Sequence, residues 1–194
     1  VAYEGQSGKA WTAIGSGSTL YSFSIRSQTG GTWNGTKTNP TIGTSETPRW
    51  VTMKSDPTSN RIMLVSVDAS SHLNIIYWNG GGAWTLNAGG FTEDTAVDTA
   101  TRRCADFDWE PTGSKGLIVW GTTAGQIAYR TFTAPSTWGA QQNLAMGANT
   151  HYWVQLRRNP SNVAGDSKIL GAVLESTVFD LGAVKWDGTT LTVI

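Results

Sequence analysis

Cysteine, histidine and charged residues are all scarce in this chain of 194 residues. Its one cysteine, Cys104, rules out a disulfide within the chain, and we expect it to be a small buried hydrophobic residue. Only His72 and His151 could serve a nucleophile as a base, and we expect both to be solvated residues in turns. No apolar run approaches the ~20 residues that a membrane-spanning helix needs, so insertion into a membrane is not expected.

Charge is low in amount and balanced in sign. Charged residues make up 14% of the chain, and 14 basic residues offset 14 acidic ones. A nucleic-acid-binding protein normally carries a basic excess, so this partner is not expected. Surface polarity must come from Ser, Thr, Asn, Gln and Gly, a composition common in secreted and cell-surface β proteins. The sequence therefore predicts an extracellular or cell-surface location. Because the chain opens at Val1 inside a repeat, we expect a processed protein or one region of a longer one.

A long internal repeat is the strongest feature of the sequence. The stretch Trp50–Trp84, shifted by 54 residues, aligns without a gap with Cys104–Trp138. Helix signals are nearly absent, because Gly, Thr, Ser and β-branched residues interrupt every helical window. Short apolar runs separated by turn residues instead predict strands. In the second repeat these are Trp50–Ser55, Arg61–Val67, Leu73–Trp78 and the beginning of a strand at Trp84–Asn87.

Two turns in this repeat have a clear physical basis. Pro57 presets φ at the second position of a turn, and the Asp56 side chain can accept hydrogen bonds from the amides that follow. The run Asn79–Gly82 supplies residues for the positive φ angles of a hairpin. The near-continuous apolar run of Arg61–Val67 predicts a strand buried on both faces.

The same pattern divides the whole chain into four repeats. Their approximate bounds are 1–44, 45–91, 92–146 and 147–194. Repeats one and three share a Glu at the first turn (Glu4, Glu110), and repeats two and four share a Trp-Asn/Asp-Gly turn (Trp78, Trp186). The array can therefore be read as two longer units of two unlike repeats each.

Repeats of about 50 residues with four strands are typical of β-propeller blades, which bury their faces by stacking on one another. The sequence therefore predicts an all-β, single-domain propeller of four four-stranded blades. A closed four-bladed ring, half of an eight-bladed ring and a fragment of a longer array all fit this prediction. A β-sandwich is the alternative, although it does not explain the ungapped repeat.

The Trp78-Asn79-Gly80 and Trp186-Asp187-Gly188 turns, with the Asp-Pro, Glu-Pro and Asn-Pro turns, resemble the tandem Trp-rich propeller repeats of bacterial surface and secreted proteins. The resemblance is one of pattern and covers the whole chain. The Ser-x-Asp-x-Gly-x-Thr-Trp box of sialidases and the Gly-His and Trp-Asp motif of WD40 blades are absent.

A propeller would place equivalent residues in rings around its axis. The ends of the four first strands carry Glu4, Asp56, Glu110 and Asn159, which are expected at one mouth of the channel. The starts of these strands carry Arg49, Arg103 and Tyr152, expected at the other mouth. An acidic ring could hold a cation and a basic ring an anion. The alternative is that the acids cap their own turns and the arginines are solvated.

The ten tryptophans fit either a core or a sugar-binding surface. Seven occupy repeat positions, which favours packing in the core: Trp33, Trp50, Trp78, Trp84, Trp138, Trp153 and Trp186. Trp11 and Trp120 lie on predicted second strands and are also expected inside. A ligand platform is expected instead on the loops Gly35–Glu46 or Gly89–Arg102.

No catalytic, cofactor or metal motif stands out, so we predict a non-enzymatic binding or structural interaction module. Its partners would be a protein or a glycan at the cell surface, or further copies of itself. A carbohydrate-binding, lectin-like propeller is one alternative. A hydrolase-type propeller is the other, and it would need two carboxylates that converge in space.

Overall fold

The computed structural model is built almost entirely of antiparallel strands, as the sequence predicts. It describes residues 1–16, 22–33, 47–91, 102–122, 125–147, 149–161, 163, 166–175 and 180–194. No helix in these ranges is long and apolar enough to cross a membrane. A short 3-10 turn, η1 (Ala88–Gly90), follows the second group of strands.

The strands form four sheets in which neighbours in the chain are neighbours in the sheet. Sheet 1 contains β1 (Ala2–Tyr3), β2 (Ala10–Ser16), β3 (Ser22–Thr29) and β4 (Thr32–Trp33). Sheet 2 contains β5 (Pro48–Ser55), β6 (Ile62–Asp68), β7 (Leu73–Trp78) and β8 (Trp84–Leu86). Each lies inside one of the segments 1–44 and 45–91 expected from the sequence.

The second half of the chain repeats this arrangement with one addition. Sheet 3 contains β9 (Ala105–Trp109), β10 (Lys115–Gly121), β11 (Gln126–Thr133), β12 (Thr137–Trp138) and β13 (Gln142–Ala145). Both β12 and β13 pair with β11, at opposite ends of that strand. Sheet 4 contains β14 (His151–Arg158), β15 (Ile169–Glu175), β16 (Leu181–Trp186) and β17 (Leu191–Val193).

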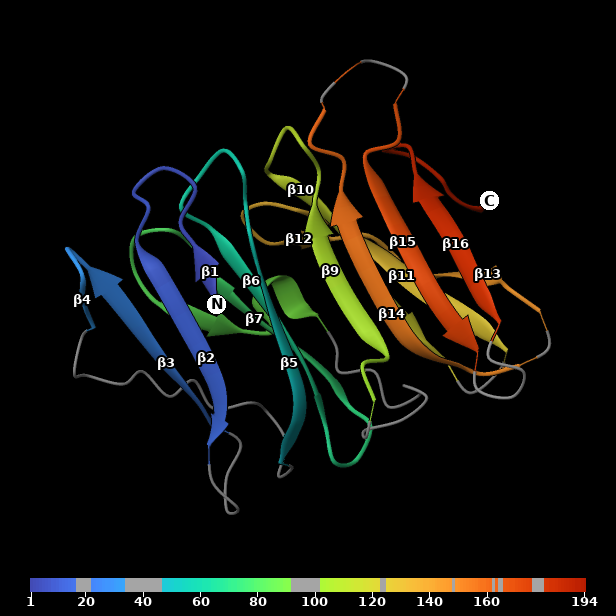
Figure 1. Ribbon diagram of the computed structural model, residues 1–194, viewed down its shortest axis with the longest axis horizontal. Coiled ribbons are helices and arrows are strands. Elements are labelled where there is room, and N and C mark those ends of the chain that lie inside the picture. Colours follow the sequence, from blue (N-terminus) through green and yellow to red (C-terminus); the bar gives the residue numbers. More distant parts are fainter. Residues whose placement is uncertain are drawn as a thin grey trace.

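The sheets follow one another in chain order, with sheets 1 and 4 at opposite ends of the molecule (Figure 1). The first strand of each later sheet contacts the first two strands of the sheet before it, and β14 does so with β9 and β10. In the same way β5 contacts β1 and β2, and β9 contacts β5 and β6. The four first strands thus lie next to one another in sequence order.

Three apolar layers fill the spaces between the sheets. Trp11 of sheet 1 packs with Leu64 and Trp78 of sheet 2. Sheets 2 and 3 share the layer that contains Leu73 and Trp120. A third layer, between sheets 3 and 4, has its own set of aliphatic and aromatic side chains. Because β6 has a layer on each face, all seven of its residues are buried, which confirms the prediction for this strand.

Burial of the tryptophans agrees with the sequence prediction at most positions. Trp11, Trp78, Trp84, Trp120 and Trp186 are buried, whereas Trp50, Trp138 and Trp153 are half-buried. The prediction was wrong for Trp33, which is 44% exposed because it ends the two-residue strand β4 at the margin of sheet 1. Cys104 is fully buried, as expected.

Candidate functional site

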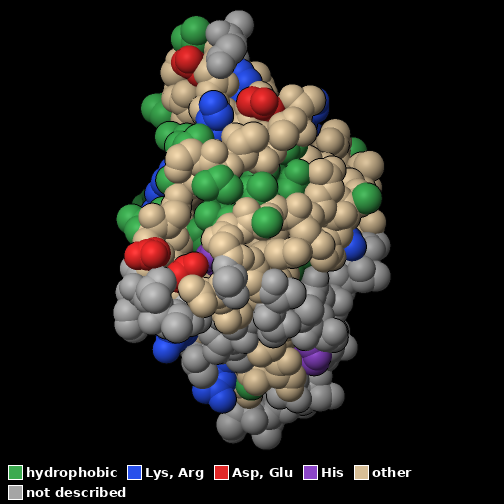
Figure 2. Space-filling view, turned by 90° about the vertical axis from the view of Figure 1, so that its right-hand side faces the viewer, with side chains coloured by type: hydrophobic (Ala, Val, Ile, Leu, Met, Phe, Trp, Pro, Cys, Tyr) green, Lys and Arg blue, Asp and Glu red, His purple; other side chains and the backbone are tan. Residues whose placement is uncertain are grey.

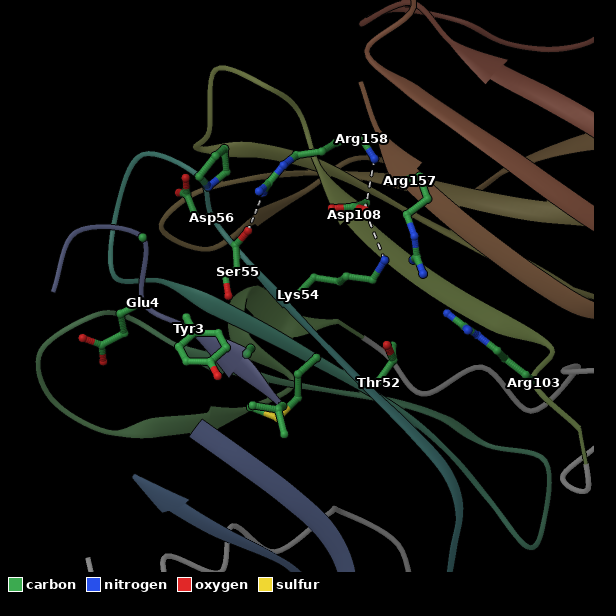
Figure 3. Close-up of a pocket in the computed structure, with 15 residues that line it drawn as sticks. Tyr3, Glu4, Thr52, Lys54, Ser55, Asp56, Arg103, Asp108, Arg157 and Arg158 are labelled. Carbon is green, nitrogen blue, oxygen red and sulfur yellow. Dashed lines mark hydrogen bonds and ion pairs between the residues drawn. The ribbon is translucent and has the colours of Figure 1, made fainter. Parts of the chain in front are cut away.

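The first strands converge on one open pocket of about 790 Å³. Its walls come from all four sheets: Tyr3 and Glu4 from the end of β1, Lys54 and its neighbours from β5, Arg103 and Asp108 from sheet 3, and Arg157 and Arg158 from β14. Figure 3 shows these side chains around the hollow. We call it the first-strand pocket.

An ion-pair network on one side of this pocket joins three sheets. The Lys54 ammonium on β5 lies 3.1 Å from the Asp108 carboxylate and 3.5 Å from that of Asp106, both on β9. It also donates a hydrogen bond of 3.0 Å to the carbonyl oxygen of Leu156 on β14. Two of the three donors of the ammonium group are therefore used within the protein, and the charge of Lys54 is balanced by two carboxylates.

Asp106 is the buried centre of this network and does not line the pocket. Its carboxylate accepts hydrogen bonds from the Arg103 guanidinium at 2.7 Å and from the amide of Leu156 at 2.8 Å. Burial raises the pKa of Asp106, and the neighbouring charges of Lys54 and Arg103 offset part of that rise. Since its side chain has no exposed surface, Asp106 joins sheets and does not contact a ligand.

The guanidinium groups of Arg157 and Arg158, on β14, are bonded to carbonyl oxygens instead of carboxylates. Arg157 donates to the carbonyl oxygen of Leu156 at 2.9 Å, and Arg158 donates to that of Ser55 at 2.9 Å. Within the described residues neither forms an ion pair with a carboxylate, and Arg157 is exposed. A guanidinium has five N–H donors, so each retains several for a bound group. Both lie beside Asp108 in Figure 3.

Glu4 and Glu110 follow directly after the first strands β1 and β9, where the sequence places them, but their oxygens are already occupied. Glu4 accepts hydrogen bonds from the indole N–H of Trp11 at 2.8 Å and from that of Trp78 at 2.9 Å, and it also bonds to Ser7. Glu110 accepts one from the indole N–H of Trp186 at 2.9 Å. Each glutamate therefore holds a tryptophan of the following sheet.

Asp56 and Asn159 occupy the same position after β5 and β14. Asp56 is fully buried and accepts bonds from the Thr58 amide, the Ser59 hydroxyl and the Ser114 amide of sheet 3. Burial alone would raise its pKa, but these hydrogen bonds together bring the pKa of Asp56 below its ordinary value. Asn159 accepts a bond from the Ser161 amide at 2.9 Å.

Asp56 and Asn159 cap their own turns, as in the alternative, whereas Glu4 and Glu110 bind tryptophan indoles.

The predicted basic ring is dispersed. Arg103 lines the first-strand pocket, and its guanidinium lies over Trp50 at 5.0 Å and over Trp153 at 5.9 Å. Arg49 is exposed on β5 and does not line the pocket, and Tyr152 is buried on β14. Of the seven predicted site residues, Glu4, Asp56 and Arg103 line the pocket.

The expectation of solvated turn histidines was wrong for His151, whereas His72 does lie in a turn. His151 is 2% exposed because β14 begins at this residue and its backbone packs against Gly121 of β10. His72 lies in the β6–β7 turn but is half-buried, with Nδ1 at 3.2 Å from the Asp68 carboxylate. Neither lines the first-strand pocket.

The two loops expected to carry a ligand platform lie largely outside the described residues. This applies to the whole of loop 35–46 and to residues 92–101 of loop 89–102.

Sequence reasoning missed the charged residues inside the first strands. Lys54, Asp108 and Arg157 occupy one repeat position, at offsets of 54 and 103 residues. A charge at the same place in three strands is the signal that could have located these side chains, and the less exposed Lys54 and Asp108 form an ion pair there.

Comparison with protein-family models and with characterised proteins found no match to this chain.

Proposed function

We propose that this chain is a non-catalytic binding module, built from blades of a β-propeller, that binds an anionic group of its partner in the first-strand pocket. The arrangement of the sheets supports the propeller. Each sheet is a meander of strands in chain order, and successive sheets pack face to face with their first strands together. A sandwich would have two sheets and one shared layer, whereas this chain has three apolar layers.

The single observation that carries the binding proposal is the difference between the acids and the bases of the pocket. Glu4, Asp56 and Asp108 are engaged by indole, backbone or ammonium donors. Within the described residues, Arg157 and Arg158 each donate one guanidinium hydrogen bond, to a carbonyl oxygen, and both line the same hollow. Guanidinium groups bind carboxylates and phosphates through paired hydrogen bonds, so an anionic group is the ligand that this pocket favours.

The same contacts argue against a hydrolase. Two carboxylates would have to reach the substrate, but Glu4 and Asp56 are buried and take part in turn and inter-sheet hydrogen bonds. Among the described aromatic residues, most tryptophans are buried or half-buried, and Tyr3 and Trp33 are the strongly exposed rings that a sugar could use. Location at the cell surface rests on composition alone and stays a prediction.

Calorimetric titration tests the proposal. Citrate, inorganic phosphate and glucuronate are the probes, and glucose is the neutral comparison. At low ionic strength we expect saturable binding of at least one anion and none of glucose.

Arg157→Ala should weaken binding about tenfold or more, because it removes a charge-assisted hydrogen bond. Lys115→Ala, an exposed cation of β10 outside the pocket, is the matched control and should bind as the unmodified protein does. Absence of binding for all three anions, or equal affinity of Arg157→Ala, would contradict the proposal.

A further inference from the structure

Large apolar side chains are exposed at the two ends of the row of sheets. At the sheet 1 end, Val1, Tyr3 and Ile14 are 72%, 61% and 59% exposed. At the sheet 4 end, Leu170 and Leu181 are 46% and 69% exposed. Figure 2 looks onto the sheet 4 end and shows hydrophobic side chains gathered at its centre. Both ends therefore expose apolar side chains on an outer sheet face, and the sheet 4 face also carries the exposed Lys185.

The outer face of sheet 4 corresponds to a face that is buried elsewhere in the same chain. In sheet 2, Val67 pairs with Leu73, and in sheet 4, Leu174 pairs with Leu181 at the same place in the ladder. Reading the strands position by position aligns Leu170, Ala172, Leu174, Leu181 and Ala183 with Met63, Val65, Val67, Leu73 and Ile75. The sheet 2 residues are all 0% exposed and pack against sheet 3.

The outer face of sheet 1 corresponds to the other half of that contact. At an offset of 106 residues, Val1, Tyr3, Thr12 and Ile14 align with Phe107, Trp109, Ile118 and Trp120 of sheet 3. These four sheet 3 residues are 0% exposed and form the layer with sheet 2. The strand pairing gives the same alignment, since Tyr3 pairs with Ala10 in sheet 1 and Trp109 pairs with Gly116 in sheet 3.

We infer that the outer face of sheet 4 binds the outer face of sheet 1 of a second copy of this chain. The two faces are the two halves of a contact that the chain already makes between sheets 2 and 3, so one copy offers what the other lacks. Such a contact joins unlike faces and either closes a ring or extends into a filament. Propellers usually have four to eight blades, so two copies, with eight sheets in all, close the ring.

The side chains at this contact are smaller than those of its internal counterpart. Ala183 stands in place of Ile75, and Ile14 in place of Trp120. Less apolar area is therefore buried, and the contact should be weaker than the internal layer and separable by dilution.

Light scattering after size exclusion measures the result. At about 0.1 mM chain, a contact of micromolar affinity is largely formed. We expect a mass twice the 20.8 kDa of one chain. Leu181→Asp on sheet 4 and Ile14→Asp on sheet 1 should each return the mass to that of one chain. Val163→Asp changes an exposed apolar residue of the β14–β15 turn, outside both faces, and should leave the dimer intact.

Mixing the two variants distinguishes this contact from one between like faces. Leu181→Asp retains an intact sheet 1 face and Ile14→Asp retains an intact sheet 4 face, so their mixture should regain a partly stable dimer. A wild-type mass of one chain, a mass above two chains, or a Leu181→Asp variant that stays dimeric would overturn the inference. Tyr3 borders both the sheet 1 face and the first-strand pocket, but the substituted residues Leu181, Ile14 and Val163 do not line that pocket. A monomer that binds an anion would therefore overturn this inference and leave the proposed function standing.

Discussion

The hydrogen bond between Glu110 and Trp186 makes a quantitative prediction about how neighbouring sheets are held. The glutamate follows β9 in sheet 3, the indole lies on β16 in sheet 4, and their atoms are 2.9 Å apart. Both side chains are buried, at 7% and 2% exposure, so the N–H has no access to water if its acceptor is removed. A hydrogen bond to a charged group contributes about 1.5–3 kcal/mol to the free energy of unfolding.

A double-mutant cycle separates the free energy of this hydrogen bond from the free energy lost with the packing of the two side chains. Glu110→Ala, Trp186→Phe and the double variant would be unfolded with urea, and the free energies of unfolding compared. We expect a coupling energy of about 1.5–3 kcal/mol. The Glu110→Ala variant should also melt lower by about 3–12 °C, on the scale usual for domains of this size. A coupling energy under about 0.5 kcal/mol, the limit for independent sites, would refute the role assigned to this pair.

Three further predictions concern stability. Trp84→Ala should lower the free energy of unfolding by about 3–5 kcal/mol, because the ring is 9% exposed and packs against two other tryptophans; a urea-unfolding loss below about 1 kcal/mol would mean a surface residue. Gly121→Ala should destabilise by about 1–3 kcal/mol, since its Cβ would lie 1.7 Å from the His151 carbonyl oxygen, whereas Gly81→Ala has open space and should melt like the parent. Asp56→Asn should be destabilising at neutral pH, and its difference from the parent should shrink as the pH falls below 3.8. Because the folded-state pKa of Asp56 is lowered, its carboxylate adds to the free energy of unfolding above the unfolded-state pKa, and this addition is lost as the pH falls through the folded-state pKa. A difference in the free energy of unfolding that stays constant with pH would contradict this reasoning.

Much of the local structure could be predicted because it depends on residues close together in the chain. The strand Leu73–Trp78 was predicted with the bounds that β7 has, since apolar residues end at the Asn79-Gly80 turn. The Asp56 turn was also confirmed, with its carboxylate 2.9 Å from the Thr58 amide. These features need only backbone preference and short-range hydrogen bonds.

Contacts between sheets could not be predicted in the same way. The bond from Trp78 to Glu4 and the ion pair of Lys54 with Asp108 each join residues of different sheets. Their existence depends on how closely and in which register two sheets approach, which a strand pattern does not specify. The burial of His151 was missed for the same reason, since it follows from the packing of β14 on β10.

The most direct test of the binding proposal is anomalous diffraction from crystals soaked in selenate, a heavier analogue of sulfate. We expect a selenium peak in the first-strand pocket, within hydrogen-bond distance of the Arg157 or Arg158 guanidinium groups. We also expect the peak to be lost in crystals of Arg157→Ala. Selenium peaks elsewhere on the protein, with none in this pocket, would contradict the claim that the pocket binds anions.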